Sequence, residues 1–287
     1  MEEGDSTVMR WEDLDTDILV EILQSFDLFE LSAGLAHVCS AWRLACCDQV
    51  LWKTLDLSVL KSNFIKIPFE PYVYVDCQSD KTLTRLLKIC LNLCRGNIQT
   101  LIFHYNLYVS NNLLTYTAER CPRLKRLVMP AWNRIKETGI CRAIRMCEDL
   151  ESMTMPSIVN PPYVMEEIAR SCKKFAELKI MGPLLSVRCT LLSKPALVIF
   201  LEGLRKLEVF NISHCVITED PPPMPMKILT ELDTSILKKA SRLGKFLTCM
   251  SDSCIMCQRT RNNEELMRWY KYEEDLWKVD EVKSLAI

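Results

Sequence analysis

Cysteine is the residue type in this sequence best suited to chemistry, because the chain has 15 cysteines and only 3 histidines. Cys254 and Cys257 have the C-x-x-C spacing of many zinc sites, and Cys249 lies close to them in the sequence. No cysteine or histidine follows Cys257, so the fourth ligand of a zinc ion would have to come from the repeats described below or from another chain. We therefore predict no metal site and no cofactor.

Sequence motifs of the common enzyme classes are absent. The three histidines, His37, His104 and His214, lie far apart, and none belongs to an HExxH motif. The seven glycines form no phosphate-binding loop, and no serine has the surroundings of a nucleophile elbow. The sequence therefore predicts a protein that is not an enzyme. A thiol or metal-dependent enzyme is the alternative, which would need bound zinc or an unusually reactive cysteine.

The composition is that of a folded protein without a strong electrostatic preference. Apolar residues make up 49% of the chain, charged residues make up 25%, and the net charge is -1. No general attraction to nucleic acid or to anionic lipid is expected from that charge. The acidic N-terminus has no secretory apolar run, and the most apolar segment, residues 195–201, is too short to cross a bilayer. These features and the odd number of cysteines predict reduced thiols in the cytoplasm or the nucleus.

Three short helices are predicted in the first fifty residues. Asp13, Asp15 and Asp17 suit the first turn of the first helix, where the helix dipole favours negative charge. Asp27 can cap the second helix, and the third covers residues 40–46. So small a module is marginally stable without a partner or a following domain. The apolar residues of the first two helices recur at spacings of three and four: Leu14, Ile18, Leu19, Ile22, Leu23 and Phe26, then Leu28, Leu31 and Leu35.

Three segments in this region, in this order, resemble the F-box. They are residues 11–23 (WEDLDTDILVEIL), residues 38–43 (VCSAWR) and the pair Leu51-Trp52. The sequence departs from the family at Asp15, where the F-box usually has proline after the leucine. We assign residues 9–55 to this domain.

The resemblance implies a partner. F-boxes lie against an adaptor of the Skp1 type, which links them to a cullin and a RING subunit. The resemblance transfers an adaptor-facing or adaptor-supporting role to seven apolar positions, and the sequence cannot separate those two roles: Leu14, Ile18, Leu19, Ile22, Leu31, Val38 and Trp42.

A repeat begins after this domain, and its unit is an apolar pattern with steps of three and then two residues. Alternate residues of such a pattern point into one core, as in a strand, and helical stretches such as residues 136–147 and 162–172 separate the copies. Successive copies begin 26, 26, 25 and 32 residues apart, and the first half repeat is Trp52-x-x-Leu55-x-Leu57. The full copies are Ile98-x-x-Leu101-x-Phe103, Leu124-x-x-Leu127-x-Met129, Leu150-x-x-Met153-x-Met155, Phe175-x-x-Leu178-x-Ile180 and Leu207-x-x-Phe210-x-Ile212.

One strand and one helix per unit of about 26 residues resembles a leucine-rich repeat solenoid. Cys121-Pro122-Arg123-Leu124 matches the C-P-x-L opening common in F-box proteins of this kind, including many from plants. We therefore expect an α/β fold with a three-helix F-box, a short leucine-rich-repeat solenoid over residues 56–220 and a helical capping tail over residues 221–287. Four cysteines are predicted to be small core residues: Cys94, Cys121, Cys147 and Cys172.

The residues between the inward positions of each strand are predicted to project from the concave face of the solenoid. This face is the candidate site for an unknown protein substrate, and the exposed Trp132 is a candidate anchor. The resemblance then implies the substrate-recognition subunit of an SCF-type ubiquitin ligase. The alternative is a scaffold that binds the adaptor without substrate turnover. The candidate residues are Thr100, Ile102, His104, Arg126, Val128, Trp132, Ser152, Thr154, Lys179, Met181, Val209 and Asn211.

The tail of the chain is predicted from two features. Pro221–Pro225 (PPPMP) interrupts regular structure and marks a linker. After it, the spacing of Ile228, Leu232, Ile236, Leu237 and Leu243 predicts an amphipathic helix that caps the solenoid. The aromatic and acidic segment 269–277 either folds back onto the solenoid or binds a partner.

Overall fold

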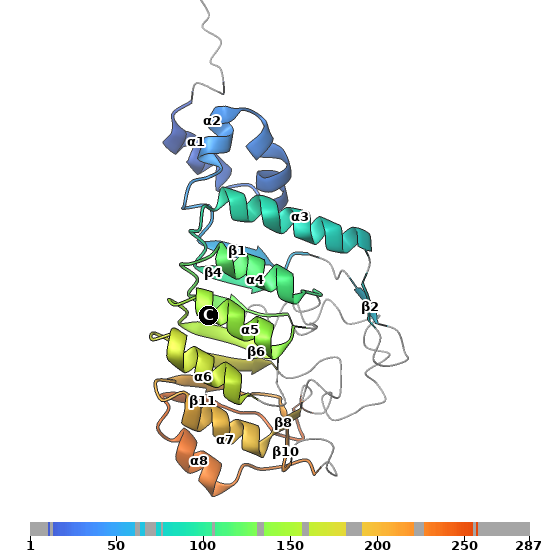
Figure 1. Ribbon diagram of the computed structural model, residues 1–287, viewed down its shortest axis with the longest axis vertical. Coiled ribbons are helices and arrows are strands. Elements are labelled where there is room, and N and C mark those ends of the chain that lie inside the picture. Colours follow the sequence, from blue (N-terminus) through green and yellow to red (C-terminus); the bar gives the residue numbers. More distant parts are fainter. Residues whose placement is uncertain are drawn as a thin grey trace, which may run out of the picture.

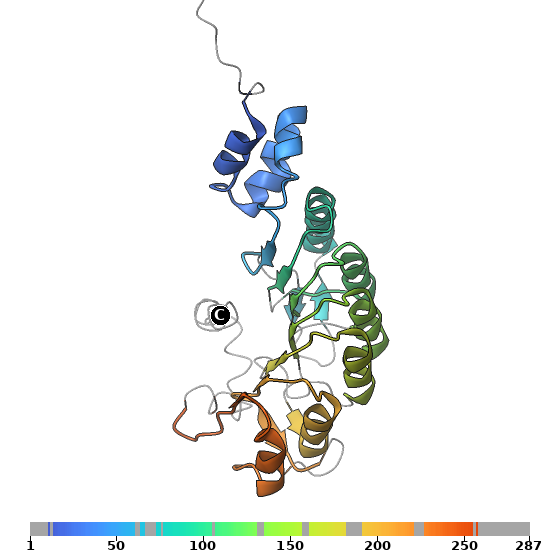
Figure 2. The same cartoon turned by 90° about the vertical axis from the view of Figure 1, so that its left-hand side faces the viewer.

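The protein is an elongated arc, with a small helical module at one end and a parallel sheet along the rest of its length (Figure 1). Helices stack along one side of the arc and the strands line the other, as Figure 2 shows. The computed structural model describes residues 11, 14–60, 64–66, 73–75, 77–104, 107–130, 135–156, 161–181, 191–220, 227–254 and 257. Trp132, the segment 221–226 and the segment 269–277 therefore lie outside the described residues, and only the backbone of Met181 is described.

The N-terminal module has the three predicted helical segments. Asp15 caps the first, because its Oδ1 accepts a hydrogen bond of 2.8 Å from the backbone N–H of Asp17. Asp27 caps the second, because its Oδ1 accepts from the N–H groups of Phe29 and Glu30 at 2.8 Å, and its own N–H donates to Glu30 Oε2 at 2.9 Å. Aspartate thus replaces the usual proline as a favourable start of the first helix. The segments are α1 (Thr16–Leu23), η2 (Glu30–Gly34) with η3 (Leu35–His37), and α2 (Ser40–Ala45).

Trp52 joins this module to the repeats. Its ring is fully buried, and its Nε1–H donates to the carbonyl of Cys46 at 2.6 Å. Two residues later the chain enters β1 (Thr54–Leu57), the first strand of the sheet. The module and the solenoid therefore share one continuous hydrophobic core.

Seven parallel strands form the main sheet, in the order β1-β4-β5-β6-β7-β9-β11. Six follow the predicted copies, including the copy after the 32-residue step, and a parallel order with intervening helices is the repeat architecture. After β1 the strands are β4 (Thr100–Phe103), β5 (Arg126–Val128), β6 (Ser152–Pro156), β7 (Glu177–Met181), β9 (Val209–Asn211) and β11 (Lys245–Leu247).

The register of the sheet aligns the second apolar residue of every copy. Leu101 pairs with Leu127, Leu127 with Met153, Met153 with Leu178 and Leu178 with Phe210. These side chains are all buried, so they form one ladder through the core. The predicted period is therefore confirmed as the repeat of the structure.

Helices connect the strands and pack in sequence order on one side of the sheet. Ser110 caps α4, since its Oγ accepts from the N–H of Leu113 at 3.2 Å, and Pro162 stands in the first turn of α6, where a missing N–H costs nothing. The helices are α3 (Cys77–Leu93), α4 (Asn111–Glu119), α5 (Glu137–Met146), α6 (Pro162–Ser171), α7 (Lys194–Gly203) and α8 (Thr234–Ala240). Short strands pair beside them: β2 (Phe64–Lys66) with β3 (Val73–Val75), and β8 (Leu191–Ser193) with β10 (Val216–Thr218).

The four cysteines predicted as core residues are buried at the ends of helices. The S–H group of Cys172 donates a hydrogen bond to the carbonyl of Cys147 at 3.3 Å, and this bond joins adjacent repeats. Burial raises the pKa of both thiols to about 12. The prediction of structural cysteines is confirmed for Cys94, Cys121, Cys147 and Cys172.

The sheet continues beyond the predicted solenoid boundary at residue 220. β11 pairs in parallel with β9, with Phe246 opposite Phe210, so the segment predicted as a capping tail contributes a further strand. The predicted amphipathic helix is present only in part, as α8, which contains Ile236 and Leu237 but begins after Leu232 and ends before Leu243. Leu243-x-x-Phe246 is a degenerate copy of the repeat, too weakly apolar after Phe246 to be recognised in the sequence.

Candidate protein-interaction surfaces

The two faces of α1 differ in exposure. Leu19 and Leu23 are at most 1% exposed and belong to the core, whereas Ile18 is 49% exposed. Ile22 lies four residues after Ile18, so it occupies the same face of the helix, where it is half-buried. α1 therefore uses one apolar face for its own fold and leaves another accessible to a partner.

Exposed apolar side chains are concentrated in the N-terminal module. Six of the eleven large apolar side chains that are exposed in the described residues fall between positions 11 and 50. Leaving so many in water costs hydrophobic free energy, which a protein partner would recover by covering them. They are Trp11, Ile18, Phe29, Val38, Leu44 and Val50. Of these six residues, only Ile18 and Val38 are among the predicted adaptor positions, because exposure does not follow from residue type.

Several residues of the F-box motif hold the module together. The Nε1–H of Trp42 donates to the carbonyl of Trp11 at 3.2 Å, and the Nε–H of Arg43 donates to the carbonyl of Ala36 at 3.1 Å. Cys39 caps α2 through a contact of 3.5 Å between its Sγ and the N–H of Trp42. Part of the motif is therefore structural and does not depend on contact with a partner.

The seven predicted adaptor positions divide accordingly. Leu19 and Leu31 are buried, so they can only support the interface from within the core. Leu14 and Trp42 are half-buried and pack against that core. Ile18 and Val38 are exposed, and with Ile22 they are the predicted positions available for direct contact.

The sheet face opposite the helices carries two rows of side chains that cross the strands. The first row passes from Thr100 through Arg126 and Ser152 to Glu177 and Val209. All five are half-buried, and Arg126 forms an ion pair with Glu177, with 3.5 Å between Nη2 and Oε2. Glu177 was missed in the sequence, although it stands just before the second apolar position of its copy, as Arg126 and Ser152 do in theirs.

The second row corrects part of the predicted substrate face. Ile102 and Val128 pair across β4 and β5 and form a small apolar cluster separate from the main core. Ile102, His104, Val128 and Thr154 are all buried and are not accessible to a substrate. All four side chains are covered on this face as well, which a strand pattern cannot indicate. Lys179 and Asn211, farther along, are half-buried.

The cysteines offer little support for a thiol nucleophile. Burial is the chief cause of a raised pKa at eight of the described cysteines: Cys46, Cys90, Cys94, Cys121, Cys141, Cys147, Cys172 and Cys257. A raised pKa keeps a thiol protonated and unreactive near neutral pH. Within the same part of the chain, no helix combines the length and apolar character needed to cross a membrane.

Comparison with known proteins agrees with this architecture. The F-box-like family model matches residues 11–58. An F-box/LRR-repeat protein of Arabidopsis thaliana is 58% identical over 298 residues, which cover 97% of this chain and 96% of the relative. A putative F-box protein of the same plant is 25% identical over 99% of this chain and 98% of its own length. F-box protein SKIP1 of Arabidopsis thaliana is 24% identical over 59% of this chain and 54% of the relative.

The similarity therefore includes both the helical module and the repeats. The F-box-like model covers the module that leaves apolar side chains exposed, and the relative at 58% identity spans the solenoid as well. This chain belongs to the F-box/LRR-repeat proteins.

Proposed function

We propose that this chain is the substrate-recognition subunit of an SCF-type (Skp1–cullin–F-box) E3 ubiquitin ligase. In this role the F-box, within residues 9–55, binds a Skp1-type adaptor that connects it to a cullin and a RING subunit. The repeats hold a target protein for ubiquitination and proteasomal degradation. The chain itself is not catalytic: it raises the local concentration of acceptor lysines near a ubiquitin-charged enzyme.

The observation that carries the proposal is the concentration of exposed apolar side chains in the F-box. A helical module with Ile18 and Val38 in water is suited to helix packing against another protein. The half-buried Leu14 and Trp42 would support that contact from below, and Leu19 and Leu31 would hold the helices in place.

The substrate surface is proposed to be the first row of the sheet face with the accessible part of the second. It combines two cationic side chains, one anionic side chain and hydroxyl groups, which suits recognition of a polar protein surface. The strands form an arc and not a closed horseshoe (Figure 2), so a folded domain or an extended segment is proposed in preference to an enclosed small molecule. The residues are Thr100, Arg126, Ser152, Glu177, Lys179, Val209 and Asn211.

Binding of the purified full chain to a Skp1-type adaptor tests the proposal, measured by isothermal titration calorimetry. The double substitution Ile18→Asp with Val38→Asp places two charges on the exposed surface and should weaken binding about tenfold or more. The matched control is Val59→Asp, since Val59 is equally exposed but lies just beyond the F-box-like region. Circular dichroism must show that all three proteins remain folded. An intact chain that fails to bind, or a double variant that binds normally, contradicts the proposal.

A scaffold that binds the adaptor without substrate turnover is the second candidate. Proteins captured by the wild-type chain, but not by an Arg126→Ala and Lys179→Ala variant, define the candidate substrates. Under the ligase proposal these proteins accumulate in plant tissue that lacks the chain and have longer half-lives there. Unchanged abundance and half-life would favour the scaffold.

A further inference from the structure

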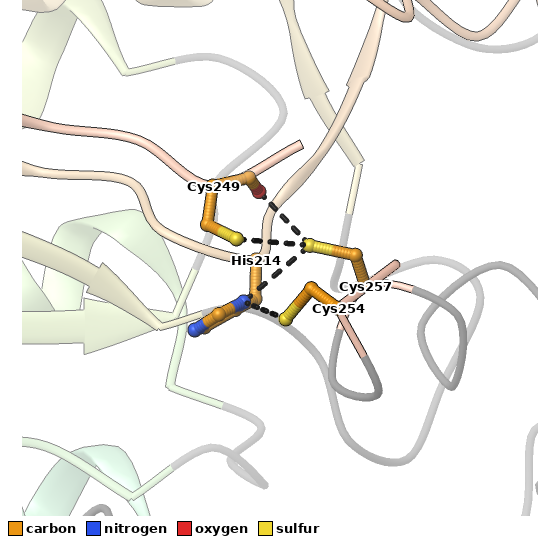
Figure 3. Close-up of side chains that lie close together, drawn as sticks. All are labelled: His214, Cys249, Cys254 and Cys257. Carbon is orange, nitrogen blue, oxygen red and sulfur yellow. Dashed lines mark hydrogen bonds between the residues drawn. The ribbon is translucent and has the colours of Figure 1, made fainter. Parts of the chain in front are cut away.

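Four side chains with metal-binding atoms meet at the end of the solenoid, as Figure 3 shows. His214 follows β9, Cys249 follows β11, and Cys254 and Cys257 come from the segment after them. Their ligand atoms, three sulfurs and one imidazole nitrogen, all lie within 4.8 Å of one another. Sequence spacing identified the three cysteines, but the folded chain supplies the fourth ligand, His214, from the turn after a repeat strand, 35 residues before Cys249.

Three of the six distances between the ligand atoms are close to the edges of a zinc tetrahedron. Zn–S bonds of about 2.3 Å and a Zn–N bond of about 2.0–2.1 Å imply N···S edges of about 3.5 Å and S···S edges of about 3.8 Å. His214 Nδ1 lies 3.4 Å from Cys257 Sγ and 3.6 Å from Cys254 Sγ, and Cys257 Sγ lies 3.5 Å from Cys249 Sγ. A disulfide would bring two sulfurs to about 2.0 Å, so the Cys249–Cys257 distance is that of two separate thiols.

The backbone presents these groups toward one point. His214 has a φ of 64°, a left-handed conformation that is uncommon for residues other than glycine. Its N–H donates to the carbonyl of Cys249 at 3.2 Å, and the same carbonyl accepts from the Cys257 thiol at 3.1 Å. Such a conformation persists only where the surroundings hold it, and it is a reason to look for a function.

We propose that His214, Cys249, Cys254 and Cys257 bind one structural Zn²⁺ ion. Three sulfur ligands and an imidazole select zinc over magnesium or calcium, which prefer oxygen ligands. All four positions of a tetrahedral ion would be filled by the protein, as in closed structural sites, leaving none open for a catalytic water.

The zinc-bound site would carry a net negative charge. Three thiolates and a neutral imidazole around Zn²⁺ carry a net charge of -1, and forming the site releases three protons from the thiols. Lys179 on β7 interacts electrostatically with His214. The positive charge of the Lys179 ammonium would partly offset the net negative charge of the zinc-bound site.

Zinc at this position would fasten the last strand of the solenoid. β11 has three residues, Phe246 is only half-buried, and Leu247 is exposed, so this strand buries less apolar surface than the central strands do. The end of a repeat array needs a cap. The ion would join the turn after β9 to the turn after β11, beside Asn211 and Lys179 of the proposed substrate surface.

Metal content of the full chain tests the proposal. The protein is expressed with added zinc, purified under reducing conditions, dialysed and analysed by inductively coupled plasma mass spectrometry. About one zinc ion per chain is expected. Replacement of zinc by Co²⁺ should produce the intense visible bands of a tetrahedral cobalt site and the near-ultraviolet absorption of cobalt–thiolate charge transfer. These two readings use the intact chain, so they do not depend on whether a variant folds.

Matched variants locate the ion. Cys254→Ser and His214→Asn should lose zinc and the cobalt spectrum; asparagine also tolerates the left-handed backbone at position 214. Cys47→Ala removes a half-buried thiol of the F-box and should keep one zinc ion. Three results overturn the proposal: no stoichiometric zinc and no cobalt spectrum in the intact chain, undiminished zinc in both site variants, or a Cys249–Cys257 disulfide found by mass spectrometry of the reduced-alkylated and non-reduced protein. None of them bears on adaptor binding, which Ile18 and Val38 test separately.

Discussion

Arg126 on β5 and Glu177 on β7 form an ion pair across the strand that separates them. The two residues and Ser152 occupy one row of the sheet, and the Nη2 and Oε2 atoms are 3.5 Å apart. Backbones two strands apart are separated by about 10 Å in a sheet, so both long side chains must extend over Ser152. The small serine leaves the space for that contact, and the pair orders the centre of the proposed substrate surface.

The pair is expected to contribute little to stability, because both side chains keep contact with water. A double-mutant cycle with Arg126→Ala and Glu177→Ala should give a coupling free energy of about 0.2–1 kcal/mol, measured by urea unfolding. Replacing Ser152 by leucine should separate the side chains and abolish this coupling. A coupling free energy of several kcal/mol would mean that the pair is a structural element of the solenoid and not a surface feature.

Neighbouring positions on α1 are expected to respond in opposite ways. Leu19→Ala leaves a cavity in the core and should lower the free energy of unfolding by about 2–5 kcal/mol, whereas Ile18→Ala should change it by about 0.5 kcal/mol or less. Ile18→Ala should weaken adaptor binding more than Leu19→Ala does, when each affinity is calculated from the concentration of folded protein. Equal losses of stability at the two positions would show that α1 has no free apolar face.

Glu167 is the buried carboxylate that ties α5 to α6. It accepts hydrogen bonds from Arg145 Nε at 2.7 Å, from Arg170 Nη2 at 2.6 Å and from Ser171 Oγ at 2.8 Å. Glu167→Gln should destabilise the chain by about 1–3 kcal/mol, because hydrogen bonds to a charged acceptor are lost. Glu166→Gln, next to it and exposed, should have almost no effect in the same denaturation experiment.

The Glu167 carboxylate should also make the stability of the chain depend on pH. Burial alone would raise the pKa of Glu167, but the hydrogen bonds from Arg170, Arg145 and Ser171 outweigh it and lower the pKa from 4.5 to about 2. Because the pKa is lower in the folded state, the stabilisation is complete above pH 4.5 and is lost as the pH falls toward 2. The difference in unfolding free energy between wild type and Glu167→Gln should therefore shrink across that interval, as measured by urea titrations at a series of pH values.

Aromatic packing at the end of the sheet tests whether β11 belongs to the solenoid. Phe210 lies between Phe200 and Phe246, with ring centroids 5.6 Å and 6.0 Å away. Phe210→Ala should lower the free energy of unfolding by about 3–5 kcal/mol, and Phe246→Ala, at a half-buried ring, by about 1–3 kcal/mol. Leu247→Ala is the exposed control and should cost about 0.5 kcal/mol or less. A neutral Phe246→Ala would indicate that the solenoid ends before β11.

Local regularity is what made much of this fold predictable from sequence. The apolar steps of three and two residues identify six of the seven strands of the main sheet, because in a solenoid each copy packs only against its neighbours. The aspartates that cap α1 and the second helix also act within their own turns, so their roles follow from sequence position. The strand β11 was missed because its copy retains only Leu243 and Phe246 of the pattern.

Exposure of individual side chains was not predictable in the same way. Ile18 and Leu19 are adjacent and both apolar, yet one is exposed and the other buried, because their helix packs on a neighbour with one face only. Ile102 and Val128 face away from the main core, as the alternation predicts, but they are buried on the second face. Whether another segment covers a face depends on contacts between distant parts of the chain.

By itself, the sequence determined the F-box, the period of the repeats and the cysteines of the core, since each depends on residues close together along the chain. Only the tertiary structure decided which apolar side chains remain free for a partner, and which residues of the sheet face are accessible. It also decided that His214 joins Cys249, Cys254 and Cys257. The physical reason is that the parallel register of β9 and β11 places two distant turns side by side. That register cannot be predicted from the spacing of residues within either segment.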